Sequence, residues 1–483
     1  MQIPVLNESQ KKQLRLQVES EIYRRSFYEF FIAASHILYP NVEWQYPPFY
    51  KYICDLLQEA VENNINGIEK KHDFIFNLPF RAGKSILLSQ IFPVWCWIKN
   101  PAMAIMQVSH SETLAIKHSH ASKMLLESEW FLSLFPELTI RRDTSAKANF
   151  MNEAGGKRIS FGIQSGIIGE GCNIQIIDDI NNPADSQAVT QGINEIYTDT
   201  LYSRLNNPSI DFRIILQQRI SATDICQYLL DTNPNKYFHV CLPVKVTNYI
   251  SPVQAIDFYQ DGLLWKDRFT EKVILDFQQT LGSRAFAGQL MQKPVAEEGN
   301  IFKRAWIKSI TLDEWRKLTN NEANIDWNLY IDTAYTAKAK DNDASAAILA
   351  CQFNNNVYVK KAWKWWLEFP ELVAKLKELK VKYNVRMLYI EAKASGLSIK
   401  QQLSREGFDC ADLTPKDKDK VARANAVSPK VEGGHLWFIE DTWNEMVLSE
   451  LTGFPFGADD LTDVVVYSID NLLNKSSFNY SML

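Results

Sequence analysis

The amino-acid sequence predicts an α/β fold with two domains, and three observations lead to this prediction. The chain has 483 residues, which at roughly 150 residues per domain allows two or three domains. Short apolar runs alternate with helical stretches over residues 71–245, a pattern typical of parallel βαβ units. A second strand-rich block begins at Asn328.

The apolar runs define the expected elements and the limits of the domains. Residues 71–295 form the first predicted domain, with strands expected at 74–78, 104–108, 174–177, 212–216 and 238–242. Residues 1–70 are expected to be a helical segment of that domain, because apolar residues recur with helical spacing at 26–38 and 49–61. The polar stretch 292–300 indicates a linker, placed at 296–327. The second domain, 328–483, has apolar runs at 329–331, 346–349, 357–359 and 387–390.

Composition and charge predict a soluble, non-secreted protein. Apolar residues make up 46% and charged residues 23% of the chain, which excludes disorder and coiled coil as the main description. The longest apolar run, 91–98, is far shorter than the ~20 residues that cross a bilayer, and the polar N-terminus lacks a secretion signal. The seven cysteines are too scattered for a zinc knuckle or a disulfide framework.

The formal net charge of −5 provides no global field that would attract nucleic acid. The charge is unevenly distributed, because residues 356–430 contain 16 Lys and Arg against nine Asp and Glu. This excess indicates either a local basic surface or an ordinary solvated face.

A candidate phosphate-binding loop follows the first predicted strand. Residues 78–85 read LPFRAGKS, and a helical stretch follows. Gly83 would let backbone N–H groups approach a phosphate at a helix N-terminus, while Lys84 would reach the β- and γ-phosphates and Ser85 would bind Mg²⁺. Arg81 adds a second cation. A leucine stands where the Walker A motif has its first glycine, so a surface turn is the alternative for the Gly-Lys-Ser tripeptide taken alone.

Polar residues end two further predicted strands of this domain. Asp178 and Asp179 follow the run 174–177; Asp178 would hold Mg²⁺, and Asp179 would act as a base or position water. Alone, the pair is better explained by an N-cap, but together with the phosphate-binding loop the Walker B assignment is favoured. The strand at 212–216 leads into Gln218 and Arg219, which suit the sensing of a γ-phosphate.

Acidic residues recur at the ends of predicted elements in the second domain. Asp332 and Glu391 end two strands, and Asp460 and Asp463 lie on one face of a helical stretch. Such a cluster is costly unless it holds cations, and two Mg²⁺ or Mn²⁺ ions ~4 Å apart would activate water and stabilise the leaving oxygen of a phosphodiester. This predicts a ribonuclease H-like nuclease; solvated caps are the alternative for these acids.

With these motifs in this order, the chain resembles the large terminase subunit of tailed bacteriophages over residues 30–473. Pro79 and Arg81 belong to that family's form of Walker A, which explains the missing glycine. Further family-like segments are Gly155-Gly156, 166–171, Gln218-Arg219 with Asp224, 282–294, 391–396, 419–424 and 454–463.

The resemblance implies a DNA-packaging motor. An N-terminal P-loop ATPase of the ASCE type would haul double-stranded DNA into a procapsid, and a C-terminal ribonuclease H-like endonuclease would cut the concatemer with two metal ions. The implied cofactors are ATP with Mg²⁺, and Mg²⁺ or Mn²⁺ at the nuclease site. The implied partners are double-stranded DNA, the portal protein, the small terminase subunit and further copies in a ring, whereas the isolated chain is compatible with a monomer. No membrane is involved, and the implied location is the host cytoplasm, transiently at the portal vertex.

The resemblance also assigns roles to residues. In the first domain, Asp179 is the catalytic carboxylate, and the residues that bind ATP and its metal are Arg81, Gly83, Lys84, Ser85 and Asp178. Gln218 and Arg219 couple hydrolysis to movement. In the second domain the catalytic acids and metal ligands are Asp332, Glu391, Asp460 and Asp463, with Asp459 as a further ligand and Asp343 less certain. Proposed DNA contacts are Lys393, Lys420 and Arg423, each of which is otherwise a surface cation. Candidates for an arginine finger are Arg81, Arg158 and Arg204.

Three residues depart from the family pattern. Asp179 stands where many members have Glu, Gln218 where Thr often precedes the coupling Arg, and Ala458 where His often precedes the acid pair. The alternative functions are a helicase-nuclease of DNA repair, a recombinase or transposase with the nuclease fold alone, and a non-catalytic portal or DNA-clamp protein. ATP hydrolysis and strand-separation assays distinguish them.

Overall fold

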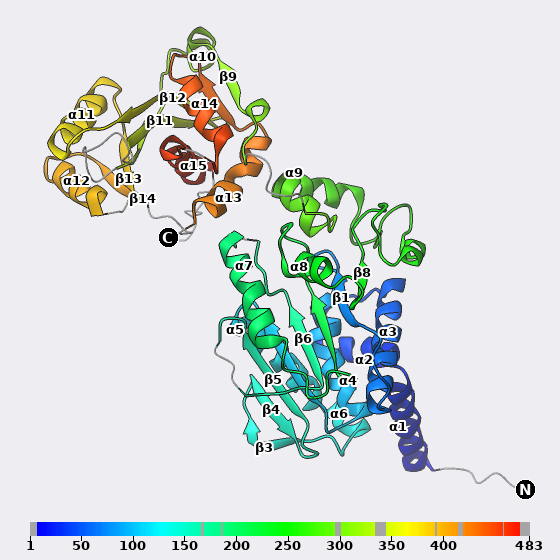
Figure 1. The fold of residues 1–483 in the computed structure, drawn as a ribbon. Coiled ribbons are helices and arrows are strands. Elements are labelled where there is room, and N and C mark those ends of the chain that lie inside the picture. Colours follow the sequence, from blue (N-terminus) through cyan, green and yellow to red (C-terminus); the bar gives the residue numbers. More distant parts are fainter. Residues whose placement is uncertain are drawn as a thin grey trace, which may run out of the picture. The chain divides into compact units, whose positions relative to one another are not determined.

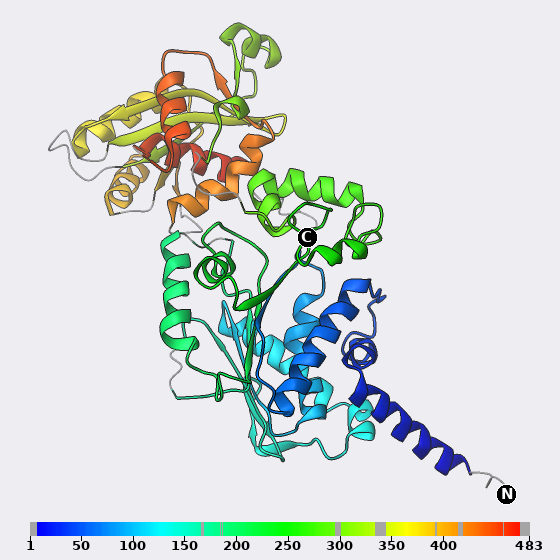
Figure 2. The ribbon, with the colours of Figure 1, turned by 45° about the vertical axis from the view of Figure 1, so that its right-hand side comes forward.

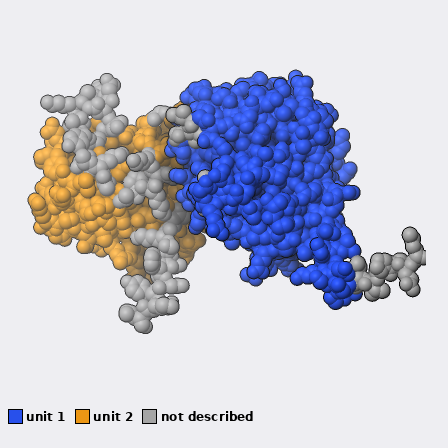
Figure 3. Space-filling model, turned by 90° about the horizontal axis from the view of Figure 1, so that it is seen from below, with its two compact units in different colours: residues 1–276, 284–296 blue, residues 277–283, 297–483 orange. Residues whose placement is uncertain are grey.

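The computed structural model describes residues 7–165, 169–183, 185, 187–294, 301–333, 344–391, 394–413, 419–456 and 458–473. The chain divides into two compact units (Figure 3). The first unit comprises residues 1–276 and 284–296, and the second comprises residues 277–283 and 297–483. Among the described residues, no helix combines the length and apolar character needed to span a membrane.

The first unit is built on an eight-stranded sheet of order β3-β4-β5-β2-β6-β7-β1-β8. Its strands are β1 (Asp73–Asn77), β2 (Ala104–Ser109), β3 (Ile140–Ser145), β4 (Asn149–Asn152), β5 (Lys157–Gly162), β6 (Ile174–Asp178), β7 (Phe212–Leu216) and β8 (Tyr237–Cys241). The strands from β5 to β8 in this order run parallel, and β3 and β4 extend the sheet in antiparallel fashion. The five predicted strands are present as β1, β2, β6, β7 and β8, so the predicted α/β class is confirmed for this unit.

Helices cover both faces of this sheet. Apolar residues of α7 (Gln187–Ile196), η2 (Tyr197–Leu201) and α8 (Ile225–Thr232) pack on one face, against Ile75, Val108, Ile177 and Ile215. Figures 1 and 2 show the blue helices on the other face. The remaining helices are α1 (Glu8–Arg25), α2 (Phe27–Leu38), α3 (Pro48–Ile65), η1 (Ile86–Ile91), α4 (Phe92–Lys99), α5 (Glu112–Leu126), α6 (Glu129–Leu134), η3 (Val253–Phe258) and α9 (Glu271–Gln289).

Buried polar side chains connect the central strands. Asp73 is fully buried, and its Oδ2 accepts a hydrogen bond from Nη1 of Arg213 at 3.1 Å. The ammonium group of Lys70 lies 2.9 Å from Oδ1 of Asp73. On β8, Nε2 of His239 lies 2.7 Å from Oδ1 of Asn77. Because Nδ2 of Asn77 already donates to the carbonyl of Gln217, its Oδ1 is the acceptor and the His239 ring is the donor.

The histidine of β8 predicts a loss of stability in acid. Burial and the nearby Arg219 lower the pKa of His239 to about 4. The unfolded chain binds this proton near the usual pKa of about 6.5, so the free energy of unfolding falls as the pH drops from 6.5 towards 4, by about 3 kcal/mol from this group. We expect His239→Gln to weaken that pH dependence in chemical denaturation at pH 7 and pH 4. Substitution of the exposed His36 is the control, and an unchanged dependence in His239→Gln would contradict the prediction.

The second unit is built on a seven-stranded sheet of order β14-β13-β10-β11-β12-β15-β9. Its strands are β9 (Lys308–Ile310), β10 (Asn328–Asp332), β11 (Ser345–Phe353), β12 (Asn356–Trp365), β13 (Met387–Glu391), β14 (Cys410–Leu413) and β15 (Leu436–Ile439). β10, β11 and β12 form an antiparallel meander, and β13 and then β14 join beside β10 in parallel. This is the strand arrangement of a ribonuclease H-like fold, as predicted.

Two apolar layers complete the second unit. One layer packs α13 (Lys420–Glu432), α14 (Asn444–Gly453) and α15 (Asp460–Leu473) on one face of the sheet. The other packs α10 (Leu312–Leu318), α11 (Phe369–Lys382) and α12 (Ala394–Arg405) on the opposite face. The α15 segment Leu461–Ile469 is buried throughout, so the helix that carries the predicted acids lies inside the unit.

The predicted linker differs from the structure. Residues 295–300 lie outside the described part of the chain, but residues 301–327 contain η4 (Arg304–Trp306), β9 and α10, all of which belong to the second unit. β9 pairs in parallel with β15, and Trp315 of α10 is fully buried against Tyr358. The placement of a linker over 301–327 was therefore wrong, because a three-residue edge strand and a helix with one deeply buried residue give little apolar signal in the sequence.

Candidate active sites

The loop after β1 has the backbone of a phosphate-binding loop. Arg81 and Gly83 have positive φ angles of 64° and 70°. A Cβ atom on Gly83 would lie 2.1 Å from Oη of Tyr50, so glycine is required there. Tyr50, on α3, donates from Oη to the carbonyl of Ala82 at 2.9 Å. The N-terminal helices therefore brace the loop, while Arg81 is exposed to solvent.

The structure brings this loop and the end of β6 together as the sequence predicts. Nζ of Lys84, which is 7% exposed, lies 2.8 Å from Oδ1 of Asp179. Oγ of Ser85 donates to Oδ1 of Asp178 at 3.2 Å. Asp179 has a φ of 46°, a conformation that is unfavourable for a non-glycine residue and is held here by its surroundings.

The environment of Asp178 disfavours the charged form of its carboxyl. Burial and the neighbouring carboxylate of Asp179 raise the pKa of Asp178 to about 7. Its Oδ2 accepts a hydrogen bond from Oγ of Ser89 at 2.6 Å, and Nε2 of His118 lies 3.6 Å away. Burial, with Arg158 and Lys117, lowers the pKa of His118 to about 4. His118 is therefore neutral near pH 7 and does not compete as a cation for Asp178.

Sequence reasoning did not find Ser89 and His118. Ser89 lies four residues after Ser85 and therefore on the same face of the helical stretch, so helical spacing was a usable signal. His118 comes from α5, far along the chain, and reaches the site only because α5 packs beside it. No local pattern in the sequence predicts that contact.

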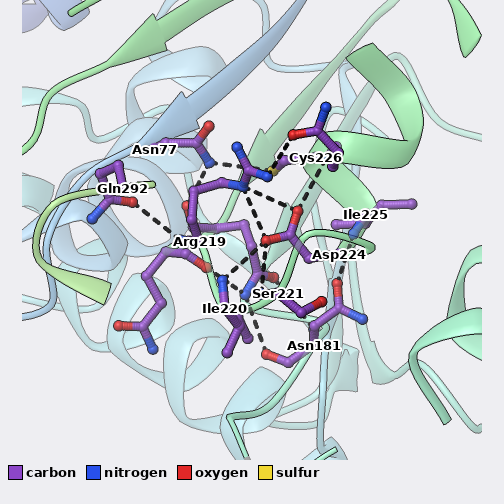
Figure 4. A network of polar contacts seen from close by, with 12 residues as sticks. Asn77, Asn181, Arg219, Ile220, Ser221, Asp224, Ile225, Cys226 and Gln292 are labelled. Carbon is purple, nitrogen blue, oxygen red and sulfur yellow. Dashed lines mark hydrogen bonds and ion pairs between the residues drawn. The ribbon is translucent and has the colours of Figure 1, made fainter. Parts of the chain in front are cut away.

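The polar end of β7 lies against the same carboxylate. The backbone N–H of Gln218 donates to Oδ1 of Asp179 at 3.1 Å. Oε1 of Gln218 is buried and has no hydrogen-bond partner within the described residues. Nε of Arg219 donates to both carboxylate oxygens of Asp224, at 3.1 and 3.0 Å, inside the network of Figure 4. Arg219 is thus fixed within the unit, while Gln218 contacts Asp179 through its backbone.

The three candidates for an arginine finger differ in accessibility. Arg158 is 1% exposed and donates from Nη2 to the carbonyl of Ser89 at 2.8 Å. Burial lowers its pKa to about 9. A buried side chain cannot reach a nucleotide held by a neighbouring molecule, so Arg158 is removed from the candidates. Arg204 is half-buried and donates to the carbonyl of Thr200 at 2.9 Å, and Arg81 is exposed.

In the second unit, two of the predicted acids end neighbouring strands. β10 and β13 are paired in parallel with Ile331 opposite Ile390, so Asp332 and Glu391 follow at adjacent strand ends. Glu391 is 2% exposed, and its Oε1 accepts a hydrogen bond from Oη of Tyr467 on α15 at 2.6 Å. Asp463, one turn before Tyr467 on the same helix, is also 2% exposed.

Basic side chains hold the acids at the start of α15. Nζ of Lys420 lies 2.8 Å from Oδ2 of Asp459 and 2.9 Å from Oδ2 of Asp463. Nη2 of Arg423 lies 3.2 Å from Oδ1 of Asp463. Burial alone would lower the pKa of Lys420, but the hydrogen bonds to the two carboxylates raise it above its usual range. Lys420 is therefore charged, and its ammonium group lies between the carboxylates of Asp459 and Asp463.

A second ammonium group holds the remaining predicted acid. Nζ of Lys364 lies 2.8 Å from Oδ2 of Asp460 and 2.8 Å from Oε1 of Glu450. Oε2 of Glu450 accepts the backbone N–H of Leu461 at 2.9 Å and so caps α15. No sequence pattern indicates that Lys364 or Glu450 lies here, because they come from β12 and α14.

The donor chemistry for a metal is present, but an assembled cluster is not. Carboxylate oxygens are the ligands that Mg²⁺ and Mn²⁺ prefer. Among the described residues, however, no three Asp, Glu, His or Cys side chains are arranged to hold a metal ion. In the first unit, the oxygen ligands of Ser85 and Asp178 are enough for a nucleotide-bound Mg²⁺, because Mg²⁺ usually takes one or two protein ligands together with substrate phosphates. Asp343 and Lys393 lie outside the described residues.

The geometry defines the class of the protein. The first unit has a P-loop with its acids at the neighbouring strand ends, and β7 stands between the loop strand β1 and the acid strand β6, as in an ASCE-type ATPase. The second unit has the ribonuclease H-like sheet with acids at β10, β13 and α15. Residues 329–472 match the model of a protein family described as the terminase RNase H-like domain.

Solved structures of similar fold cover most of the chain. The large terminase from a thermophilic bacteriophage, in its second crystal form, gives a TM-score of 0.54 at 10% identity, covering 89% of this chain and 100% of that one. The same terminase in complex with ATP-γ-S gives 0.51 at 12% identity, covering 86% and 97%. None of the curated proteins compared with the sequence matches it. The predicted resemblance to large terminase subunits is confirmed by the family match and by this fold.

Proposed function

We propose that this protein is the large subunit of a phage DNA-packaging motor, which hydrolyses ATP to translocate double-stranded DNA into a procapsid and cuts concatemeric DNA. The observation that carries the proposal is the pairing of Lys84 with Asp179 and of Ser85 with Asp178 at the P-loop, in a chain whose residues 329–472 match a terminase nuclease domain. The large terminase of the thermophilic phage was solved with ADP and with ATP-γ-S, which supports a nucleotide at this loop.

The residues of the first unit have distinct tasks in hydrolysis. Backbone N–H groups around Gly83 bind the phosphates at the helix N-terminus. Lys84 leaves Asp179 to bind the γ-phosphate, which frees the Asp179 carboxylate to orient water and accept its proton. Ser85 and Asp178 would hold Mg²⁺, which supplies charge neutralisation for the phosphates. The N–H of Gln218 keeps the Asp179 carboxylate in position, since it donates to Oδ1 at 3.1 Å.

In the second unit, we assign the nuclease acids as Asp332, Glu391, Asp460 and Asp463, with Asp459 beside them. Bound Mg²⁺ or Mn²⁺ would supply an activated water and a Lewis acid for the leaving oxygen. Tyr467 orients Glu391 through its hydrogen bond. Lys420 and Arg423 form ion pairs with Asp459 and Asp463, and DNA phosphates are the other anions that these two cations would bind.

The partners follow from the same proposal. A motor of this kind works on double-stranded DNA at the portal of a procapsid, with a small terminase subunit and further copies of the chain in a ring, in the host cytoplasm and transiently at the portal vertex. The exposed Arg81 and the half-buried Arg204 remain the candidates for a residue that reaches the nucleotide of a neighbouring copy.

The test uses the wild-type chain with supercoiled plasmid, ATP and Mg²⁺ or Mn²⁺. We expect ATP hydrolysis and conversion of the plasmid to nicked and linear forms. A duplex carrying a single-stranded tail distinguishes the repair-type helicase-nuclease, because a packaging motor leaves the strands paired. Strand separation driven by ATP would therefore overturn the proposal in favour of that alternative, and a folded chain without either activity would favour a non-catalytic clamp.

The proposed phosphate contact of Lys420 makes a separate prediction. Each protein cation that neutralises a phosphate contributes about 0.9 to the slope of log K against log salt. Lys420→Met is expected to weaken binding of duplex DNA and to lower this slope by about 1, measured by fluorescence anisotropy between low and moderate salt in the absence of metal. Lys361→Met, which removes an ion pair with Asp441 elsewhere in the unit, is the control. An unchanged slope in Lys420→Met would restrict Lys420 to holding the acids.

A further inference from the structure

The last turns of α9 and the residues after them occupy a particular place along the chain. Residues 284–296 belong to the first unit, whereas the residues on both sides of them, 277–283 and those from 297 onwards, belong to the second. A displacement of this segment is therefore passed through the backbone, at both of its ends, to residues of the second unit. The contacts that hold residues 284–296 in the first unit therefore act on a segment that is joined to the second unit at both ends.

The end of this segment lies directly on the loop that follows β7. Gly288 has no room for a side chain, because a Cβ atom there would lie 2.8 Å from the carbonyl oxygen of Arg219. Oε1 of Gln292 accepts the backbone N–H of Arg219 at 3.1 Å, and Nε2 of Gln292 donates to the carbonyl of Gln289 at 2.6 Å. Figure 4 shows the side chain of Gln292 reaching the Arg219 backbone.

Gln292 is held in an unfavourable conformation for this contact. Its φ is 54° and it is 2% exposed. A left-handed φ at a residue other than glycine persists only where the surroundings impose it. The segment is also attached elsewhere, through the carbonyl of Leu290 to the N–H of Val244 and through the carbonyl of Met291 to Oη of Tyr249. Of these contacts, the one made by the Gln292 side chain is the one that reaches the β7 loop.

Two successive N–H groups of that loop bind to different parts of the unit. The N–H of Gln218 donates to Asp179, the carboxylate that also holds Lys84. The next N–H, that of Arg219, donates to Gln292. When nucleotide draws Lys84 away from Asp179, the acceptor of the Gln218 amide changes its charge environment, and the adjoining peptide unit carries any reorientation to Gln292. The Arg219 side chain is held separately, through its hydrogen bonds to Asp224.

We propose that Gln292 is a positioning residue that transmits the nucleotide state of the P-loop site to the segment 284–296, and so to the second unit. The inference rests on the proposed ATP hydrolysis by the first unit. It adds the residue that connects the nucleotide site to the segment 284–296. The side chain of Gln292 binds the Arg219 N–H and the Gln289 carbonyl and supplies none of the groups assigned to hydrolysis, so its loss uncouples the segment without removing catalytic groups.

The experiment is hydrogen–deuterium exchange of the full chain with and without ATP-γ-S and Mg²⁺, on wild type and Gln292→Leu. In the wild type, nucleotide is expected to protect residues 78–92 and to change the exchange of residues 288–294. Gln292→Leu should exchange roughly fivefold faster over 288–294, the effect of one lost hydrogen bond, with no further response to nucleotide, while residues 78–92 are protected as before. Basal ATP hydrolysis stays within about twofold of the wild type, since the groups that react are intact.

Two further variants separate transmission from simple damage. Gln292→Glu keeps an acceptor oxygen for the Arg219 amide but loses the hydrogen bond to the Gln289 carbonyl, so residues 288–294 should exchange faster and still respond to nucleotide. Gln289→Leu keeps the backbone carbonyl that Gln292 uses and should behave as wild type. A response at 288–294 that survives in Gln292→Leu, or that is absent from the wild type although 78–92 is protected, overturns this inference alone. No protection at 78–92 in the wild type overturns the proposed function together with it.

Discussion

Replacing Lys84 with methionine is expected to reduce ATP hydrolysis by about 10²–10³-fold, the usual effect of removing one group that stabilises transition-state charge. Lys84 is 7% exposed and its ammonium group lies 2.8 Å from Asp179, so it is already directed into the site before nucleotide binds. Methionine keeps the length of the side chain and fills the same space, which separates the loss of charge from the loss of packing. Steady-state phosphate release with Mg²⁺ and saturating ATP measures the effect.

The matched control for Lys84→Met is Lys51→Met in the same unit. Lys51 lies 2.6 Å from Asp55, but both side chains are more than half exposed. Such a surface pair contributes about 0–1 kcal/mol to stability, and its loss should leave hydrolysis unchanged. The nuclease activity of Lys84→Met should also stay at the wild-type level, because the acids of the second unit are untouched. Hydrolysis by Lys84→Met within about tenfold of the wild type would contradict the assigned role.

Three of the five strands that the sequence predicted in the first unit share one physical property. β1, β6 and β7 are buried at every position, and strands covered on both faces read as continuous apolar runs. β4 and β5, which lie between the edge strand β3 and the strand β2, mix buried residues with half-exposed or exposed ones, so neither reads as a continuous apolar run. They were missed for this reason, and β9 was assigned to a linker for the same reason.

The candidate sites show a similar division. Lys84, Asp178 and Asp179 could be found because a motif places them at fixed positions relative to a strand and a helix. Lys364 and His118 could not, because their contacts with Asp460 and Asp178 arise only when β12 packs near α15 and α5 packs near β6. The sequence thus predicts the reactive groups that a motif places at the ends of strands and helices. The side chains that neutralise those groups are brought beside them only by tertiary packing, which the sequence does not reveal.

The buried acids of the second unit are stabilised by neighbouring side chains. Glu391 and Asp463 are each 2% exposed, and burying unpaired carboxylates would be costly. Arg423 provides a charge partner for Asp463 at 3.2 Å, and its guanidinium lies 5.2 Å from the ring centroid of Tyr467. Tyr467 in turn donates to Glu391. Arg423 and Tyr467 thus join the two acids in one network.

This network makes Glu391 the residue whose substitution should affect DNA cleavage most clearly. Glu391→Gln keeps the shape of the side chain and an oxygen that accepts the Tyr467 hydroxyl, but it removes the negative charge. Residues that merely orient metal ligands typically cost 10–100-fold when changed, so the loss of a ligand's charge is expected to reduce plasmid cleavage by at least about a hundredfold. Agarose-gel rates with Mn²⁺ and with Mg²⁺ measure this.

The control for Glu391→Gln is Glu406→Gln, which removes a carboxylate that pairs with Lys377 in the same unit. ATP hydrolysis by both variants should equal that of the wild type, which shows that the first unit is intact. Because the amide oxygen of the Glu391→Gln side chain would still accept the Tyr467 hydrogen bond, the thermal stability of the second unit should change little, and Mn²⁺ should stabilise it less than it stabilises the wild type. Cleavage by Glu391→Gln at the wild-type rate would mean that the buried end of β13 is structural and that the nuclease acids lie elsewhere.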